Sequence, residues 1–306
     1  MKIKILLSGI AAMALSFSSC NLDTDDDNNY MTGTYPCCNL VIPENGDAFA
    51  TTANYSMAFY YTSGTASLAT TNLSLGYGTM AFTTNNMDVD TKYYEYNGKN
   101  ADVTSFSGGY ANMNGVTVQN VNGCVSSVIN MVSTNDPQNP DYIFTPRIAM
   151  IASYTANYDY TVKTFMPDAI YTGTTNIQTA GSTSAPFTND GVKYRVIFSQ
   201  DLKKADIIFY NAKFASAMPV TINFVLQNLD VKYNKNGYEI TGENITPQLY
   251  EASGLTPAPR YQITSFQFQN TSSDLTTGSA LYTVQIGDAV YYGDFQGFYA
   301  LTGPRE

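Results

Sequence analysis

The sequence predicts an all-β protein built from two similar antiparallel β-barrel or β-sandwich domains. Its 306 residues contain many short runs in which apolar and polar side chains alternate, and a period of two is typical of strands with one buried face. Tyrosine and phenylalanine are abundant, at 25 and 16 residues, and aromatic side chains favour strands. Helical periodicity is almost absent, with only one or two helical turns expected between Asn139 and Tyr154.

The chain begins with a predicted signal peptide, residues 1–19. Two lysines precede an apolar run from Ile5 to Phe17, and two serines then lead to Cys20. The apolar run is too short to span a bilayer, because a spanning helix needs about 20 residues. The pattern therefore predicts secretion, with Cys20 at the cleavage site.

This start resembles the lipobox of bacterial lipoproteins, in the looser form that Bacteroidota use. The resemblance implies that Cys20 is acylated and becomes the N-terminus, so that the protein has a membrane partner through its lipid anchor. Residues 20–35 would then form an acidic tether. A calcium loop is the alternative for its aspartates, but the glycine turn and the bidentate glutamate of an EF-hand are missing. The tether's four aspartates are Asp23, Asp25, Asp26 and Asp27.

Closely spaced like charges cannot bury apolar area, so the tether is expected to stay extended and solvated. Acidic residues directly after the anchor also resemble the surface-export signal of Bacteroidota lipoproteins. That resemblance implies a location on the extracellular side of the outer membrane.

The body is expected to consist of hairpins. Lys193–Ser199 and Ala205–Phe214 alternate on either side of a short polar turn. Further along, Asn236 and Gly237 suit a type I′ turn, whose central residues both need positive φ. The segment from Asp288 to Leu301 is expected to form the closing strands.

An internal duplication is predicted from three pairs of segments that keep their order in both halves. A longer loop in the first copy, between Pro137 and Tyr158, would explain the difference in offset. The expected domains are residues 36–172 and 173–306. The paired segments are Tyr94–Thr104 with Tyr233–Thr241, Asn72 with Asn211, and Tyr160–Gly173 with Tyr282–Gly293.

The second half also resembles the calycin-like, lipocalin-type domains of Bacteroidota lipoproteins. The resemblance rests on the "YTG" at Tyr171, the succession of hairpins and the ending "YYGDFQGFY", and it covers residues 171–303. It implies a barrel, but it assigns no ligand-binding residue.

Composition excludes several classes of function. The absence of histidine excludes Ser-His-Asp and Cys-His catalysis as well as histidine-based zinc or haem sites. The formal net charge of −10 argues against nucleic acid as a partner, because phosphate binding depends on Lys and Arg. The glycines from Gly76 to Ala81 match a dinucleotide fingerprint, but no helix is expected after them. We therefore expect neither a cofactor nor a metal.

Three cysteines remain if Cys20 is acylated, so one disulfide would leave one thiol over. A disulfide from Cys37 or Cys38 to Cys124 is expected, and a strained disulfide between the adjacent Cys37 and Cys38 is the alternative.

Tyrosine clusters are the remaining candidates for a site. Flat rings can stack on sugar faces, although alternating tyrosines in strands more often pack into a core. The closing segment supplies the candidate aromatic ligand surface: Tyr291, Tyr292, Phe295, Phe298 and Tyr299.

The first functional prediction is a non-enzymatic outer-membrane lipoprotein that binds a glycan or a small apolar molecule. The second is a structural or adhesive, fimbria-like subunit, or an accessory subunit of an outer-membrane complex, with an outer-membrane protein as partner. The third is a histidine-free hydrolase that uses two carboxylates, such as Glu239 and Glu243 or Asp288 and Asp294. A deep apolar cavity would favour ligand binding. A packed core with an exposed edge strand or tyrosine patch would favour adhesion.

Overall fold

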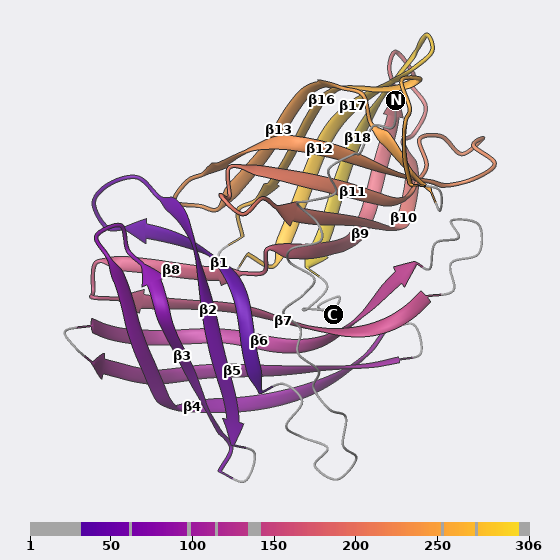
Figure 1. Ribbon diagram of the computed structural model, residues 1–306. Helices are drawn as coiled ribbons and strands as arrows, with labels where there is room; N and C mark the ends of the chain where they lie inside the picture. The colour runs from indigo at the N-terminus through magenta and orange to yellow at the C-terminus, as the bar shows by residue number, and fades with distance from the viewer. Residues whose placement is uncertain are drawn as a thin grey trace, which may run out of the picture.

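The computed structural model describes residues 32–60, 63–96, 99–113, 116–133, 142–251, 254–272 and 275–299. All elements in these ranges are β-strands (Figure 1). Among them there is no helix that is long and apolar enough to cross a bilayer. The signal peptide, Cys20 and the four tether aspartates lie outside the described residues.

Eight strands form the first barrel, drawn in indigo to magenta in Figure 1. Each strand pairs antiparallel with the next, and β8 pairs back with β1 to close the ring. Closure pairs the end strands with each other. Among the described pairings, β8 reaches only Ala152–Ala156 of β7. The strands are β1 (Gly33–Pro43), β2 (Phe49–Tyr60), β3 (Thr65–Ser74), β4 (Thr79–Tyr96), β5 (Lys99–Met113), β6 (Val116–Ser133), β7 (Tyr142–Ala156) and β8 (Tyr160–Phe165).

The second barrel follows the same up-and-down course, and its ring closes where β18 pairs with β9. The pairing of β11 with β12 completes its wall, and a hairpin of two short strands pairs with β12 outside the ring. The ring strands are β9 (Asp168–Thr179), β10 (Phe187–Phe198), β11 (Lys204–Ala212), β12 (Ile222–Tyr233), β13 (Tyr238–Ile245), β16 (Tyr261–Asn270), β17 (Thr277–Ile286) and β18 (Ala289–Tyr299); the outer hairpin is β14 (Gln248–Glu251) and β15 (Gly254–Pro257).

The predicted all-β class with two similar barrels is confirmed. From Tyr142 to Ala156 the segment expected to hold helical turns and a longer loop is instead strand β7, so that expectation is wrong over this range. Residues 137–141 of the expected loop lie outside the described residues. Its side chains from Met150 to Ala156 are buried at every second position, as the alternation of a strand requires. The junction between the barrels lies at Met166 and Pro167, so the expected boundary at residue 172 falls inside β9.

Two of the three paired segments occupy equivalent strands. Asn72 and Asn211 each lie in the third strand of their barrel, and Tyr94–Thr104 and Tyr233–Thr241 each join the fourth strand to the fifth. The third pair is not equivalent. It matches β8 and β9, which belong to different barrels, with β17 and β18 of the second barrel. The duplication itself stays a prediction.

The hairpin at Asn236 uses a different turn from the expected one. Asn234 and Gly237 exchange backbone hydrogen bonds, and the central residues are Lys235 and Asn236, neither of which has positive φ. The Asn234 side-chain oxygen accepts hydrogen bonds from the N–H groups of Asn236 and Gly237. The Asn234 side chain thus stabilises the turn, which needs no pair of residues with positive φ.

The two barrels share an aromatic contact at their junction. Phe165 at the end of β8 lies against Phe198 and Tyr238 of the second barrel, with ring centroids 5.4 and 5.2 Å apart. Strand β1 is accordingly buried on both faces between Cys37 and Val41, because its outer face packs against the neighbouring barrel.

Candidate functional site

The interior of the second barrel is filled with its own aromatic rings. Tyr194 stacks on Phe295 with centroids 3.9 Å apart, and Phe209 stacks on Phe224 at 4.3 Å. Phe209 also meets the edge of Tyr282. Packing of this kind has the density of a protein core. The space that a lipocalin-type ligand would need is occupied by side chains.

Glycines on the barrel wall make room for these rings. Gly278, Gly297 and Gly173 lie opposite one another on β17, β18 and β9. A methyl group on Gly278 would lie 2.6 Å from the ring of Phe268, and one on Gly297 would overlap the ring of Phe295. Only the absence of a side chain at this row allows the core to close.

Each barrel also buries a pair of tyrosine hydroxyls beside an asparagine. In the first barrel Tyr154 lies 2.6 Å from Tyr55, which donates to the Asn39 side-chain oxygen at 2.7 Å. In the second barrel, the hydroxyls of a tyrosine pair lie 2.7 Å apart and the asparagine amide donates to one of them at 2.8 Å. That network consists of Tyr171, Tyr238 and Asn270. Each of these four tyrosine hydroxyls has a hydrogen-bond partner, so we assign both networks to the core and not to a binding site.

The five predicted aromatic residues do not form one surface. Phe295 and Tyr299 point into the barrel, while Tyr292 and Phe298 point outward and are 51% and 45% exposed. Tyr291 is half-buried. Successive side chains of a strand point to opposite faces, so a continuous run of aromatic residues is divided between core and solvent.

A groove of about 470 Å³ lies on the outer wall of the second barrel, across β13, β16, β17 and β18. One row of paired residues crosses it: Glu243 lies opposite Ser265, Ser265 opposite Thr283, and Thr283 opposite Tyr292. Strands are about 4.8 Å apart, so the carboxylate and the tyrosine stand about 14 Å apart on the two sides. Serine and threonine form a low floor between them.

The next row adds an amide and an apolar side chain. Gln267 lies opposite Leu281, and the Gln267 amide donates to the Glu239 carboxylate at 2.6 Å. On the floor, the hydroxyl of Ser265 lies 3.1 Å from that of Thr283. The groove thus combines two carboxylates, an amide, three Ser/Thr hydroxyls and an exposed ring.

The geometry of the glutamate pair does not suit hydrolysis. Glu239 and Glu243 lie four residues apart on the same strand, so they stand side by side and do not face each other across the groove. Paired catalytic carboxylates in glycosidases stand about 5–9.5 Å apart across a cleft. These two acids line one side of the groove instead.

The cysteines occupy different surroundings. Cys37 and Cys38 are buried in β1, Cys124 is half-buried in β6, and the structure describes all three as thiols. Burial raises the pKa of the Cys38 thiol to about 12, and it also raises that of Cys37, so both are poor nucleophiles. The expected disulfide to Cys124 stays a prediction. The described residues contain no group of three acids or cysteines that could hold a metal ion.

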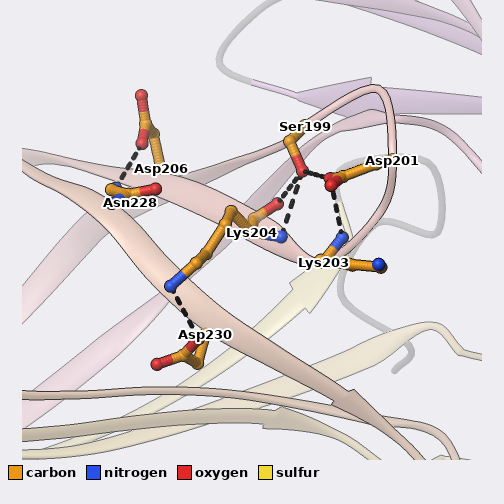
Figure 2. Close-up of polar contacts among 7 residues, drawn as sticks. All are labelled: Ser199, Asp201, Lys203, Lys204, Asp206, Asn228 and Asp230. Atoms are coloured by element: carbon orange, nitrogen blue, oxygen red, sulfur yellow. Dashed lines mark hydrogen bonds and ion pairs between the residues drawn. The ribbon is translucent and has the colours of Figure 1, made fainter.

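The predicted hairpin from Lys193 to Phe214 is confirmed as β10 and β11. Figure 2 shows the polar contacts around its turn: the Ser199 hydroxyl donates to Asp201 at 2.7 Å, and Lys204 pairs with Asp230 of β12 at 2.6 Å. Asp206 accepts the N–H of Asn228 at 2.7 Å. These contacts join neighbouring strands, and we assign them to the stability of the hairpin.

No protein-family model matches the chain, and no curated protein matches it. Among solved structures, a Bacteroides fragilis protein assigned as an outer membrane protein matches with 12% identity and a TM-score of 0.31, over 88% of this chain and 97% of that one. A mutant of the vaccine antigen transferrin binding protein B from Haemophilus parasuis matches with 8% identity and a TM-score of 0.26, over 88% of this chain and 76% of that one. Likenesses of this size carry no argument about function.

Proposed function

We propose that the protein is a non-enzymatic lipoprotein of the outer-membrane surface that binds a glycan in the groove of the second barrel. The proposal rests on two features of the second barrel: its interior is filled with aromatic side chains, and a groove lies on its outer wall. An exposed ring, Tyr292, faces the carboxylate of Glu243 there across a floor of hydroxyls. A binding function must therefore use the outside of the barrel.

The chemistry of the groove fits a sugar. The C–H face of a pyranose can pack on the Tyr292 ring, while its hydroxyls donate to Glu239 and Glu243 and exchange hydrogen bonds with Gln267. A small apolar molecule has much weaker support, because the polar groups of the groove would lose water without gaining partners.

The groove is tested with the purified full-length protein on a glycan array, followed by calorimetry with the best oligosaccharide. Tyr292→Ala should weaken binding at least tenfold, which corresponds to about 1.4 kcal/mol. Tyr110→Ala is the matched control, because Tyr110 is equally exposed on the first barrel. No binding to any glycan, or equal affinity of the Tyr292 variant, would contradict the proposal.

The anchor is tested separately. Several acyl chains, at about 0.8 kcal/mol per buried CH₂, hold a protein firmly in a membrane. Cys20→Ser should therefore move the protein from the membrane fraction to the soluble fraction, whereas Cys124→Ser should not. Replacing the four tether aspartates with asparagine should leave the protein membrane-bound but hidden from protease added to intact cells. A Cys20 variant that stays in the membrane would refute the anchor.

A structural or accessory role is the second candidate, and one observation favours it. Within the described part of the chain, strand β15 pairs with β14 alone and all four of its residues are exposed, so one of its edges has no strand beside it there. An open edge can pair with a strand of another chain, although Pro257 at its end limits that pairing. If this role holds, oligomers should form as concentration rises, and Leu255→Lys should abolish them.

A further inference from the structure

The turn between β7 and β8 contains a residue in a conformation that its type rarely adopts. Asn157 and Tyr158 both have positive φ, at 49° and 64°. Asparagine tolerates this left-handed region, but a bulky aromatic residue does not, and glycine is the usual choice. The left-handed backbone conformation of Tyr158 therefore costs free energy that a glycine at this position would not cost.

Two other residues with the same conformation show how such a cost is normally offset. Apart from asparagines and Tyr158, the described non-glycine residues with positive φ are Leu202 and Leu275. Their side chains are 4% and 1% exposed, so burial of an apolar side chain compensates the strain. Tyr158 is 67% exposed, and burial offers no such compensation. Nothing inside the fold offsets the backbone strain at Tyr158, so we look for a role of its ring in contacts with another molecule.

Tyr158 belongs to a rim at the end of the first barrel, which we define by Tyr77, Asn157, Tyr158 and Tyr160. Tyr77 is 63% exposed, and its ring lies 5.9 Å from that of Tyr160. The Asn157 side chain holds the rim together, because its amide donates to the Tyr77 hydroxyl at 3.0 Å and its oxygen accepts the N–H of Thr117 at 3.0 Å. The rim thus presents two exposed rings, those of Tyr77 and Tyr158, on turns that the Asn157 side chain connects.

The position of the rim suits contact with another molecule. The chain enters the barrel at Gly33, and β1 runs from there to Pro43, where the rim lies beside it: Pro43 pairs with Tyr160. Ten residues along a strand span about 33 Å. The rim therefore lies at the end of the barrel opposite to Gly33.

The charges around the rim indicate the partner. Asp159 follows Tyr158 directly and is exposed, and its carbonyl accepts the N–H of Glu44, an exposed acid of the β1–β2 turn. One cation lies beside these acids: the ammonium of Lys235, in the β12–β13 turn, donates to the Glu44 carbonyl at 3.2 Å. The Asn157 amide and oxygen are engaged as well. The side chains left for a partner are therefore the exposed carboxylates of Glu44 and Asp159 and the ring faces. Ring faces beside carboxylates attract guanidinium and ammonium groups. Tyrosine on turns rich in glycine and asparagine is also typical of protein-binding loops, because the ring offers much contact area at low entropic cost.

We propose that this rim is a docking surface for the basic face of a partner protein. The proposal is independent of the groove, which lies on the other barrel.

The test uses the full-length protein, nona-arginine as the probe and the variant Tyr158→Gly. Glycine suits the backbone at this position, so the thermal midpoint should rise by about 2–4 °C while the affinity for nona-arginine falls at least fivefold. Asp159→Asn should weaken binding and reduce its salt dependence. Tyr60→Ala is the matched control, because Tyr60 is exposed at the opposite end of the barrel and should leave the affinity unchanged.

The chain is acidic and attracts cations without specificity, so the difference between variants is the readout. Equal affinities of Tyr158→Gly and the parent protein would overturn the proposal. So would equal losses in the Tyr60 and Tyr158 variants. Binding of a neutral oligosaccharide that depends on Tyr158, without binding of nona-arginine, would assign the rim to glycans instead. Loss of nona-arginine binding in Tyr292→Ala alone would place the cationic contact in the groove.

Discussion

The hydroxyl groups of Tyr55 and Tyr154 lie 2.6 Å apart inside the first barrel, on strands β2 and β7. Because the single proton of Tyr55 is directed at Asn39, the Tyr154 hydroxyl must donate to Tyr55. Tyr55 is therefore the central member of the network: it donates to the Asn39 oxygen and accepts from the Tyr154 hydroxyl.

This order predicts unequal effects of removing each hydroxyl. Tyr55→Phe leaves two buried groups without a partner and should lower the free energy of unfolding by about 3 kcal/mol. Tyr154→Phe keeps the bond from Tyr55 to Asn39 and should cost about 1 kcal/mol. Urea denaturation measures both, with Tyr60→Phe at an exposed position as the control. Equal losses would contradict the assigned direction of the hydrogen bonds.

Buried tyrosines also predict unfolding at alkaline pH. Burial raises the pKa of Tyr171 and of Tyr282 from 10.0 to about 12. Because the pKa in the folded state is higher than in the unfolded state, the folded state is fully favoured below pH 10, and this stability is lost as the pH rises toward about 12. Circular dichroism should fall in that range together with a rise in tyrosinate absorbance. Complete ionisation of the tyrosines with an unchanged circular dichroism would refute this.

The row of glycines on β17, β18 and β9 predicts a position at which even one added methyl group destabilises the fold. A side chain at Gly173 would overlap the backbone oxygen of Gln296 on the neighbouring strand. Gly173→Ala should therefore destabilise the second barrel by about 3 kcal/mol. Gly33→Ala is the control, because the nearest atom to its added methyl group would be 3.9 Å away. Equal thermal midpoints of the two variants would contradict the close approach of β9 and β18.

The contact of Phe165 with Phe198 and Tyr238 predicts that the barrels unfold together. Phe165→Ala should lower stability by about 3–5 kcal/mol and separate the unfolding of the two barrels. Scanning calorimetry should then show two transitions instead of one. Phe298→Ala, at an exposed position, should keep the single transition. Two transitions in the unmodified protein would mean that the junction does not couple the barrels.

The alternation of side chains was enough to predict the class and several hairpins. In the segment from Lys193 to Phe198 every second residue is buried, as its pattern of apolar residues indicates. The same alternation misled at β7, where proline and polar residues suggested a break. Pro146 lies within the strand, opposite Ile129 of β6, while β8 pairs only with the later part of β7, Ala152–Ala156. Proline is tolerated where one side of a strand needs no N–H donor.

The candidate site was predicted only in part. Tyr292 was recognised, but it was grouped with Phe295 and Tyr299, which face the core. One signal could have separated them: Gly293 and Gly297 share a face with Phe295, and glycines in a strand often mark the side on which rings need space. The glutamates of the groove were noticed only as a carboxylate pair. Their relation to Tyr292 depends on the register of four strands.

The sequence by itself determined the local features of this protein: strands with a period of two, the hairpins between them, and a leader that predicts secretion with a lipid anchor. These follow from interactions between residues that are close along the chain. Only the tertiary structure decided that both rings close, that aromatic side chains fill the second barrel, and that a groove and a rim remain outside. Those features arise from strand pairing and core packing between distant residues, such as Gly173 with Gly297 and Tyr77 with Asn157.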